Sequence, residues 1–291
     1  MRAASFYLLS LAALAAAAPS EPQAVDEIAF ACGNPPPAAE HLALVSAVAD
    51  EEVEKMSGNF TVEAEAALSV NVYFHVVASA KTEAGGWVAD ERIQKQVTVL
   101  NDNYNSHGIT FKHAGTTRTV DAAWAQGQGV EAMKAKLRQG SYDDVNIYVQ
   151  PSLGGGAAGV CTLPGPTAGG PGTYATDGCQ VVTASLPDGK PYNGINDGKA
   201  GVHEVGHWFG LYHTFQGGCD GDGDYVADTP AEASPPPNGG CPVGRDSCPT
   251  QSGKDPIHNH MDYTSGKCKT EFTAGQQTRM HNMFQKFRAG K

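Results

Sequence analysis

Residues 203–213 read His203-Glu204-Val205-Gly206-His207-Trp208-Phe209-Gly210-Leu211-Tyr212-His213, which is the pattern H-E-x-x-H-x-x-G-x-x-H. On a helix, residues four apart lie on one face with Cβ atoms about 5–6 Å apart, so the imidazoles of His203 and His207 can converge on one metal ion. Glu204 lies about 100° further round the helix, which places its carboxylate beside the metal without making it a ligand. This spacing predicts a zinc-binding helix that carries a general base.

A third ligand requires the chain to leave this helix and turn back. Glycine adopts the left-handed conformation that ends a helix, so Gly210 can end it and return His213 to the metal. Three imidazoles then leave one position open for water, as in catalytic zinc sites. The alternative is a buried helix whose histidines only satisfy hydrogen bonds, and the third histidine makes this alternative much weaker.

Length and charge limit the organisation of the chain and its partners. The 291 residues can form one large domain or two small ones, and the formal net charge is −11. Nucleic acids and anionic membrane surfaces bind basic faces, so the charge argues against both as partners. We expect a monomer that acts on protein or peptide partners.

The N-terminal region resembles a targeting segment followed by a pro-segment. Met1 and Arg2 precede an apolar run at residues 3–18 that is too short to span a membrane, so residues 1–18 predict a secretory signal and an extracellular protein. Residues 19–58 are rich in Pro and Ala and predict a pro-segment, and residues 59–291 the catalytic domain. Secretion permits disulfides and makes Asn59, in an Asn-Phe-Thr sequon, a candidate glycosylation site.

Seven cysteines leave one thiol over, and Cys32 stands more than a hundred residues from the other six. Cys32 lies in the pro-segment, in an extended and turn-prone context. A thiolate there could occupy the fourth position of the zinc and keep the protein latent. The alternative is that Cys32 joins a disulfide or is discarded with the pro-segment.

Hydrophobic patterning before the motif predicts an α/β layer. Asp90 is a candidate helix cap, and the helix after it carries a core-facing stripe from Ile93 to Tyr104. The other predicted elements are strands at 68–77, 109–113, 145–149 and 181–186 and a short helix at 130–137. Residues 153–164 are rich in glycine and could form an edge strand that pairs with an extended peptide, or a plain loop.

The composition changes after His213, where Gly, Pro, Asp and Cys dominate residues 217–249 and predict a small, disulfide-stapled subdomain. Hard oxygen ligands alternate with glycines in this region, as in calcium loops, although such strings also form plain turns. The candidate calcium ligands are Asp220, Asp222, Asp224 and Asp228. Thr273 and Gln276 predict a capping box at the start of a closing helix.

Two further segments carry a resemblance to a known family. Residues 259–263, Asn-His-Met-Asp-Tyr, resemble the Met-turn of the metzincin metallopeptidases, in which a methionine forms an apolar floor beneath the zinc. The motif at 203–213, the Ala-Asp-Thr-Pro segment at 227–230 and the Met-Asp-Tyr segment at 261–263 together resemble the pappalysin family, especially its secreted fungal members. Met261 is then the floor residue, and Tyr263 would lie near the zinc.

The resemblance also implies a fold. It is a metzincin-like zincin of the α/β (α+β) class, with an upper lobe at about 68–213 that holds a mixed twisted sheet and the active-site helix. The lower lobe, at about 214–291, is irregular and ends in a helix, and the family places calcium beside it. The implied disulfides are Cys219–Cys248 and Cys241–Cys268, which leaves Cys161 and Cys179 as a third candidate pair.

One departure concerns specificity. Relatives that prefer a basic residue after the scissile bond tend to carry an acid between the Met-turn tyrosine and the next cysteine. That segment here is Thr-Ser-Gly-Lys at 264–267, and Lys267 would repel a basic side chain. We therefore do not extend the basic preference to this chain.

The sequence as a whole predicts a secreted zinc endopeptidase. His203, His207 and His213 hold the zinc, Glu204 acts as general base and Tyr263 assists the oxyanion. Two alternatives stay open: a catalytically dead binding protein stabilised by zinc, which the intact Glu204 argues against, and a zinc hydrolase that does not act on peptides.

Overall fold

The computed structural model describes residues 31–57, 66–166, 174–189 and 195–291. The segment predicted as a secretory signal, residues 1–18, and the sequon at Asn59 lie outside these ranges. A five-stranded sheet forms the centre of the upper lobe, in the strand order β2-β1-β3-β5-β4. Its strands are β1 (Leu68–Ala78), β2 (Ile109–Val120), β3 (Val145–Gln150), β4 (Gly159–Cys161) and β5 (Cys179–Val182).

The sheet is mixed, as expected. Neighbouring strands among β2, β1, β3 and β5 run parallel, and the edge strand β4 pairs antiparallel with β5. The glycine-rich segment at 153–164 therefore contributes an edge strand, as one of the two sequence interpretations held. Its outer side pairs with another extended part of the chain, the segment around Cys32.

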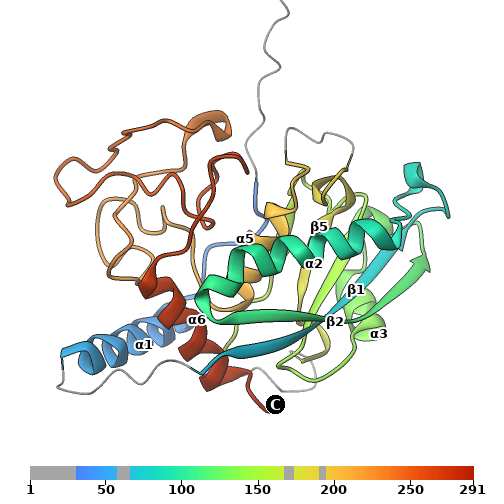
Figure 1. Cartoon of the computed structure of the whole chain (residues 1–291), viewed down its shortest axis with the longest axis horizontal. Helices are drawn as coiled ribbons and strands as arrows, with labels where there is room; N and C mark the ends of the chain where they lie inside the picture. The colour runs from blue at the N-terminus through green and yellow to red at the C-terminus, as the bar shows by residue number, and fades with distance from the viewer. Residues whose placement is uncertain (1–30, 58–65, 167–173, 190–194) are drawn as a thin grey trace, which may run out of the picture.

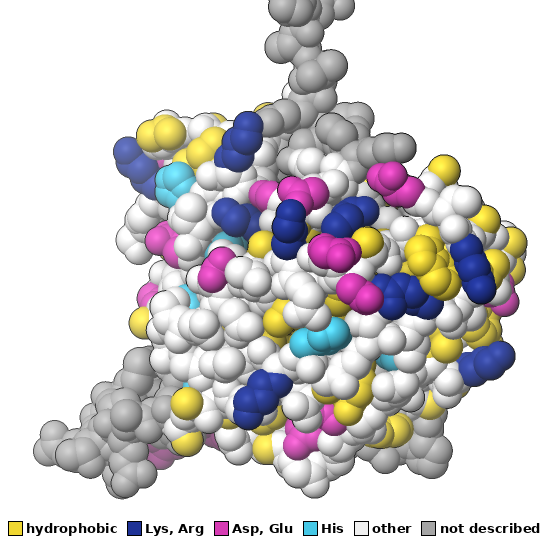
Figure 2. All heavy atoms as spheres, turned by 45° about the vertical axis from the view of Figure 1, so that its right-hand side comes forward, with side chains coloured by type: hydrophobic (Ala, Val, Ile, Leu, Met, Phe, Trp, Pro, Cys, Tyr) yellow, Lys and Arg dark blue, Asp and Glu magenta, His cyan; other side chains and the backbone are white. Residues whose placement is uncertain are grey.

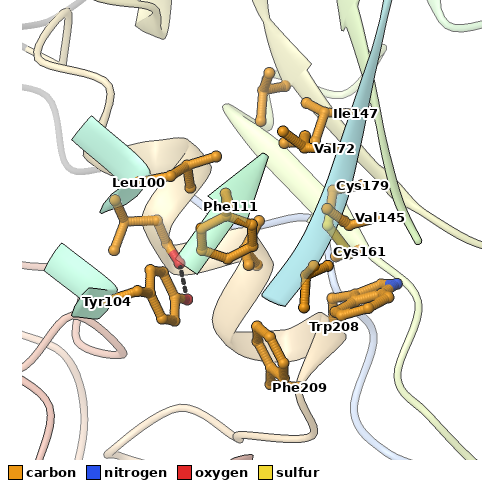
Figure 3. Close-up of a cluster of buried hydrophobic side chains, with 14 of the residues drawn as sticks. Val72, Leu100, Tyr104, Phe111, Val145, Ile147, Cys161, Cys179, Trp208 and Phe209 are labelled. Carbon is orange, nitrogen blue, oxygen red and sulfur yellow. Dashed lines mark hydrogen bonds between the residues drawn. A yellow bond between two sulfur atoms is a disulfide. The ribbon is translucent and has the colours of Figure 1, made fainter. Parts of the chain in front are cut away.

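Helices cover both faces of the sheet (Figure 1). On one face, α2 (Asp90–Tyr104) and α5 (Lys199–Trp208) enclose the main core, while α3 (Val130–Leu137) packs on the other face. Figure 3 shows Tyr104 of α2 and Phe209 at the end of α5 beside Phe111 of β2. The Tyr104 hydroxyl donates to the carbonyl of Val202 at 2.8 Å, which ties α2 to the active-site helix.

Three local predictions need correction. The cap of α2 is Ala89 rather than Asp90, whose carboxylate accepts from the Arg118 guanidinium instead. The strand predicted at 109–113 continues to Val120, because β1 pairs with it along its whole length. The strand predicted at 181–186 runs instead over Cys179–Val182 and turns into a 3₁₀ helix at Thr183–Ser185, where the Ser185 hydroxyl donates to the Val182 carbonyl.

The lower lobe consists mainly of loops held by disulfides, and it lies beside the sheet at the upper left of Figure 1. The bonds Cys219–Cys248 and Cys241–Cys268 lie in this lobe, and Cys161–Cys179 joins β4 to β5. These are the three pairs expected from the sequence. Cys32 is the free cysteine among the described residues.

The closing helix α6 (Ala274–Phe287) connects the two lobes. It begins with the predicted capping box, in which Thr273 and Gln276 exchange hydrogen bonds. Just after its end, the buried Arg288 donates two hydrogen bonds to Asp177 and one to the carbonyl of Trp208. Because Trp208 is the last residue of α5, this network fixes the end of the active-site helix.

Helix α1 (Ala39–Ser57) belongs to the predicted pro-segment and packs against α6 (Figure 1). On the face drawn in Figure 2, Lys and Arg side chains lie intermingled with Asp and Glu side chains rather than in one basic patch. Among the described residues, no helix combines the length and apolarity that crossing a membrane requires.

Candidate active site

The active-site helix α5 brings His203, Glu204 and His207 to the buried centre of the molecule, between the sheet and the lower lobe. The helix ends at Trp208, and Gly210 has φ +93°, the left-handed conformation that the turn requires. A Cβ atom at Gly210 would lie 2.8 Å from the side chain of Met283. Glycine is therefore needed here for both its conformation and its size, and the turn returns His213 to the helix.

The three imidazoles converge on one point. Nε2 of His207 and Nε2 of His213 are 3.1 Å apart, and the ring centroids of His203 lie 4.9 and 5.2 Å from those of His207 and His213. One ring nitrogen from each histidine and the sulfur of Cys32 all lie within 4.8 Å of one another. Neutral imidazoles and a thiol at this spacing are a donor set suited to zinc.

Backbone carbonyls fix the orientation of two of these rings. Nδ1 of His203 lies 2.7 Å from the carbonyl of His260, and Nδ1 of His207 lies 2.7 Å from that of Leu211. A carbonyl only accepts, so Nδ1 carries the proton and Nε2 keeps its lone pair for a metal. Burial lowers the pKa of both histidines, to about 4 for His207, which keeps the rings neutral.

Glu204 is fully buried beside the histidines, and burial raises the pKa of its carboxyl to about 8. Its Oε2 accepts from the Cys32 thiol at 3.6 Å. A Cβ atom at Gly159 would lie 2.4 Å from Cγ and from Oε1 of Glu204. The edge strand β4 can therefore lie against this carboxylate only because it has glycine there.

Met261 lies beneath the active-site helix. It is completely buried, and its sulfur would lie 2.4 Å from a Cβ atom at Gly206, so the glycine in the middle of α5 makes room for it. Asn259 holds the turn by accepting a hydrogen bond from the Met261 backbone N–H at 2.9 Å. Met261 therefore occupies the position predicted for the floor residue.

Tyr263 lies beside the histidine cluster, in ring contact with His203 and His213. Its ring centroid is 4.9 Å from that of His213, in an edge-to-face arrangement, and its hydroxyl donates to the carbonyl of Cys32 at 3.3 Å. The hydroxyl thus contacts a peptide carbonyl that lies against the histidine cluster. A phenol in this position can donate to a carbonyl oxygen as negative charge develops on it.

The segment around Cys32 is paired with the edge strand. Ala158 N–H donates to the carbonyl of Ala31 at 2.8 Å, and Gly33 N–H donates to that of Gly159 at 2.7 Å, in parallel orientation. The Asn34 amide continues the pairing, because it both accepts from and donates to the backbone of Cys161. Burial, and then the nearby Glu204, raise the pKa of the Cys32 thiol.

The aspartate loop is arranged differently from the histidine site. Asp220, Asp222 and Asp228 are exposed, and Asp228 accepts from the Thr273 hydroxyl and the Gly275 N–H at the start of α6. Asp224 is buried, which raises the pKa of its carboxyl to about 7. In the described ranges these carboxylates do not form a cluster of three within 4.8 Å, although a pocket of about 440 Å³ is lined by Asp222, Asp224 and Asp228.

Sequence reasoning missed two residues near the site. Lys269 is fully buried, and burial lowers its pKa to about 8, although the nearby Asp197, Asp262 and Glu204 act in the other direction. No local pattern distinguishes this lysine from the exposed Lys267 two residues earlier. The second residue is Gly159, whose contact with Glu204 was not predicted. The glycine-rich segment at 154–159 was the sequence feature that could have indicated a close approach of the backbone.

Residues 133–285 match the peptidase M43 family, described as pregnancy-associated plasma protein-A. An "Extracellular metalloprotease" of Pyricularia oryzae is 47% identical over 262 residues, which cover 90% of this chain and 91% of the relative. "Extracellular metalloprotease 1" of Coccidioides posadasii is 46% identical over 285 residues, 97% of each chain.

The fold also resembles solved structures. Mature mirolysin of Tannerella forsythia, in complex with a cleaved peptide, is 26% identical with a TM-score of 0.64 over 76% of this chain and 93% of that one. A promirolysin mutant from the same organism, 24% identical, aligns with a TM-score of 0.70 over 87% of this chain and 93% of that one. The expected α/β fold with a mixed sheet is confirmed.

Proposed function

The chain belongs to the pappalysin family of metallopeptidases, and on this premise we propose that it is a secreted zinc endopeptidase made as a latent precursor. The convergence of the His203, His207 and His213 side chains beside the buried Glu204 carries the proposal. The relatives are named extracellular metalloproteases, which supports residues 1–18 as a secretory signal. Extracellular proteins and peptides are the proposed substrates.

The donor set favours zinc as the metal. Three neutral imidazoles, two of them oriented by backbone carbonyls, fit zinc better than they fit the hard cations, which prefer carboxylate and carbonyl oxygens. Three protein ligands also leave a position for the reacting groups. When bound, the ion supplies a Lewis acid that polarises the scissile carbonyl and acidifies a water molecule.

Glu204 is proposed to move the proton. Its carboxylate lies beside the ligand cluster, and its raised pKa of about 8 suits a group that must both accept and return a proton. In the reaction it takes the proton from the attacking water and delivers it to the leaving amine. The second oxygen of the carboxylate is buried and has no hydrogen-bond partner among the residues that the structure describes, so it is available for this transfer.

Tyr263 and the edge strand β4 are proposed to hold the substrate. Residues 31–34 pair with β4 through backbone hydrogen bonds and place the Cys32 carbonyl against the Tyr263 hydroxyl. A substrate in the same cleft can use the same donors and acceptors once this segment has left. Tyr263 then donates to the scissile carbonyl oxygen as it gains negative charge.

Cys32 is proposed to keep the precursor latent by occupying the fourth ligand position. Its sulfur lies 3.5 Å from Nε2 of His207 and within the same ligand cluster as the three histidines. Residues 19–58 are then the pro-segment and residues 59–291 the catalytic domain, with lobes at about 68–213 and 214–291. The Asp224 pocket is the candidate for a structural calcium ion, because a divalent cation would compensate its buried carboxylate.

Cleavage of unfolded casein by the processed protein tests this proposal. We expect cleavage at internal peptide bonds that a zinc chelator abolishes and that added zinc restores. An active protein that retains full activity after complete removal of zinc would contradict the proposed chemistry, and absence of cleavage with zinc bound would favour a binding protein.

A further inference from the structure

The pro-segment contacts the rest of the chain at a second place, away from Cys32. Helix α1 packs against α6 at the lower left of Figure 1. The buried side chains of Val45 and Val48 pack against Tyr212, Met283 and Phe287. We call the part of this interface that lies outside the pro-segment, formed by Tyr212, Arg279, Asn282, Met283 and Phe287, the α1-binding surface.

An ion pair lies at the centre of this interface. Glu52 of α1 is 8% exposed and Arg279 of α6 is fully buried, and their side chains share three hydrogen bonds of 2.9–3.2 Å. Asn282 donates a further hydrogen bond to Glu52 at 3.0 Å. At the rim, Lys286 donates to Glu51 at 2.6 Å. The surface thus recognises a carboxylate inside an apolar stripe of a helix.

The α1-binding surface is continuous with the active-site cleft. Tyr212, which directly precedes His213, lies with its hydroxyl 2.5 Å from Nδ1 of His41 at the start of α1. A pocket of about 280 Å³ extends from His207 and His213 past Tyr212 to the prolines at 35–37 that lead into α1. A chain that leaves the cleft at this end therefore reaches the α1-binding surface directly.

Removal of the pro-segment leaves this surface without its partner. Arg279 loses its ion pair with Glu52, and removing one member of a buried ion pair leaves the other charge without its direct partner. Tyr212, Met283 and Phe287 lose their apolar cover at the same time. An apolar patch with a basic centre beside an active site is suited to binding another helix of the same chemistry.

We propose that the α1-binding surface serves in the processed protein as an exosite for protein substrates, and that it takes an amphipathic helix with a carboxylate in its apolar stripe. This inference rests on the proposed peptidase function. Peptides that fill only the cleft lack the additional contact, so the exosite favours larger substrates that carry such a helix near the cleaved bond.

Two substrates with one cleavable core test the exosite. The first is a short quenched peptide taken from a casein cleavage site, and the second is the same core joined at its N-terminal side to residues 39–57 through a flexible Gly/Ser linker of about 20 residues. Residues 39–57 do not include Cys32, so they cannot act through the metal. We expect the processed protein to show a KM at least tenfold lower for the fusion and a similar kcat, because the contact is made equally in the ground and transition states.

Variants of the fused helix separate the specific contact from general charge. Glu52→Gln in the fusion should return KM most of the way to that of the core, whereas the matched change Glu40→Gln, at an exposed position of the same helix, should leave it low. Free 39–57 peptide should compete with the fusion and leave cleavage of the core unchanged. All substitutions lie in the substrate, so folding of the enzyme is not affected.

Equal KM values for core and fusion, or no effect of Glu52→Gln, would overturn the exosite while leaving the peptidase function intact. A processed protein that is a dimer, which free 39–57 peptide dissociates, would also overturn it, because a second copy would then occupy the surface. If the core is not cleaved at all, the proposed function fails. In that case fluorescence anisotropy of labelled 39–57 peptide with the processed protein still tests the surface, and lack of saturable binding sensitive to Glu52→Gln contradicts the inference.

Discussion

The sulfur of Cys32 lies 3.5 Å from Nε2 of His207, across 175 residues of sequence. The same thiol donates to Glu204, and the backbone on both sides of Cys32 pairs with the edge strand β4. One residue of the pro-segment therefore contacts a proposed metal ligand and the proposed base, and its neighbours fill the cleft.

Replacing Cys32 should release latency. The full-length variant Cys32→Ala should cleave a quenched peptide at least tenfold faster than the full-length parent, because a removable backbone segment blocks the cleft less firmly than a metal ligand does. Initial rates would be measured while intact mass shows that the chain is unprocessed. Pro35→Ala, an exposed change in the same segment, is the control and should stay latent. Equal latency in both variants would assign inhibition to the remaining pro-segment contacts.

Glu204→Gln should abolish turnover without removing the metal. The amide keeps the size of the side chain but cannot accept the proton from water, and a general base contributes about 10²–10⁴-fold to rate. We therefore expect casein cleavage to fall at least 100-fold while metal analysis still finds one zinc per chain. A variant that keeps its activity would exclude Glu204 as the base. A variant that loses zinc would show that Glu204 is needed for the metal site itself, which contradicts the expected result.

Gly159→Ala should damage the site from the edge strand. The added Cβ would lie 2.4 Å from Cγ of Glu204, so the carboxylate or β4 must move. We expect kcat to fall at least tenfold with zinc content unchanged. Gly240→Ala is the matched control, because its nearest neighbour would be 3.8 Å away and its φ is −62°. Similar kinetics for both variants would show that Glu204 tolerates the displacement.

Asp224→Asn should stabilise the protein at alkaline pH in calcium-free buffer. Burial raises the pKa of Asp224 to about 7 in the folded state from 3.8, so the parent loses stability as pH rises between these values. The asparagine variant lacks this loss, and its free energy of unfolding at pH 8 should exceed that of the parent by up to about 4 kcal/mol, with the difference disappearing near pH 4.

Thermal unfolding at both pH values measures this effect, and calcium provides a second comparison. A calcium ion in the Asp224 pocket would compensate the buried carboxylate, so added calcium should raise the melting temperature of the parent and not of Asp224→Asn. A parent that is more stable than the variant at pH 8 without calcium would contradict the cost assigned to the buried charge.

The sequence predicted the parts of the site that local chemistry determines. His203 and His207 share a helix face, Gly210 has the left-handed conformation that the turn to His213 needs, and Gln276 completes the capping box with Thr273. These features depend on residues within about ten positions of one another. Their spacing alone therefore restricts the backbone strongly.

Contacts between distant segments had no such signal. Arg279 pairs with Glu52 across 227 residues, and Arg288 pairs with Asp177 across 111. In the sequence, each of these four residues resembles an ordinary surface charge, and only the tertiary fold buries them. The strand predicted at 181–186 was misplaced for the same reason. Pairing with β3 and β4, rather than the β-propensity of its own residues, determines where this strand begins and ends.

X-ray absorption at the zinc edge of the purified full-length precursor tests the central claim most directly. A site formed by His203, His207, His213 and Cys32 predicts one zinc per chain with three nitrogen neighbours at about 2.0–2.1 Å and one sulfur at about 2.3 Å. The sulfur signal should be absent from Cys32→Ala and from the processed protein, which should keep the three nitrogens. A precursor without bound zinc, or a zinc site without sulfur in the latent precursor, would contradict the account.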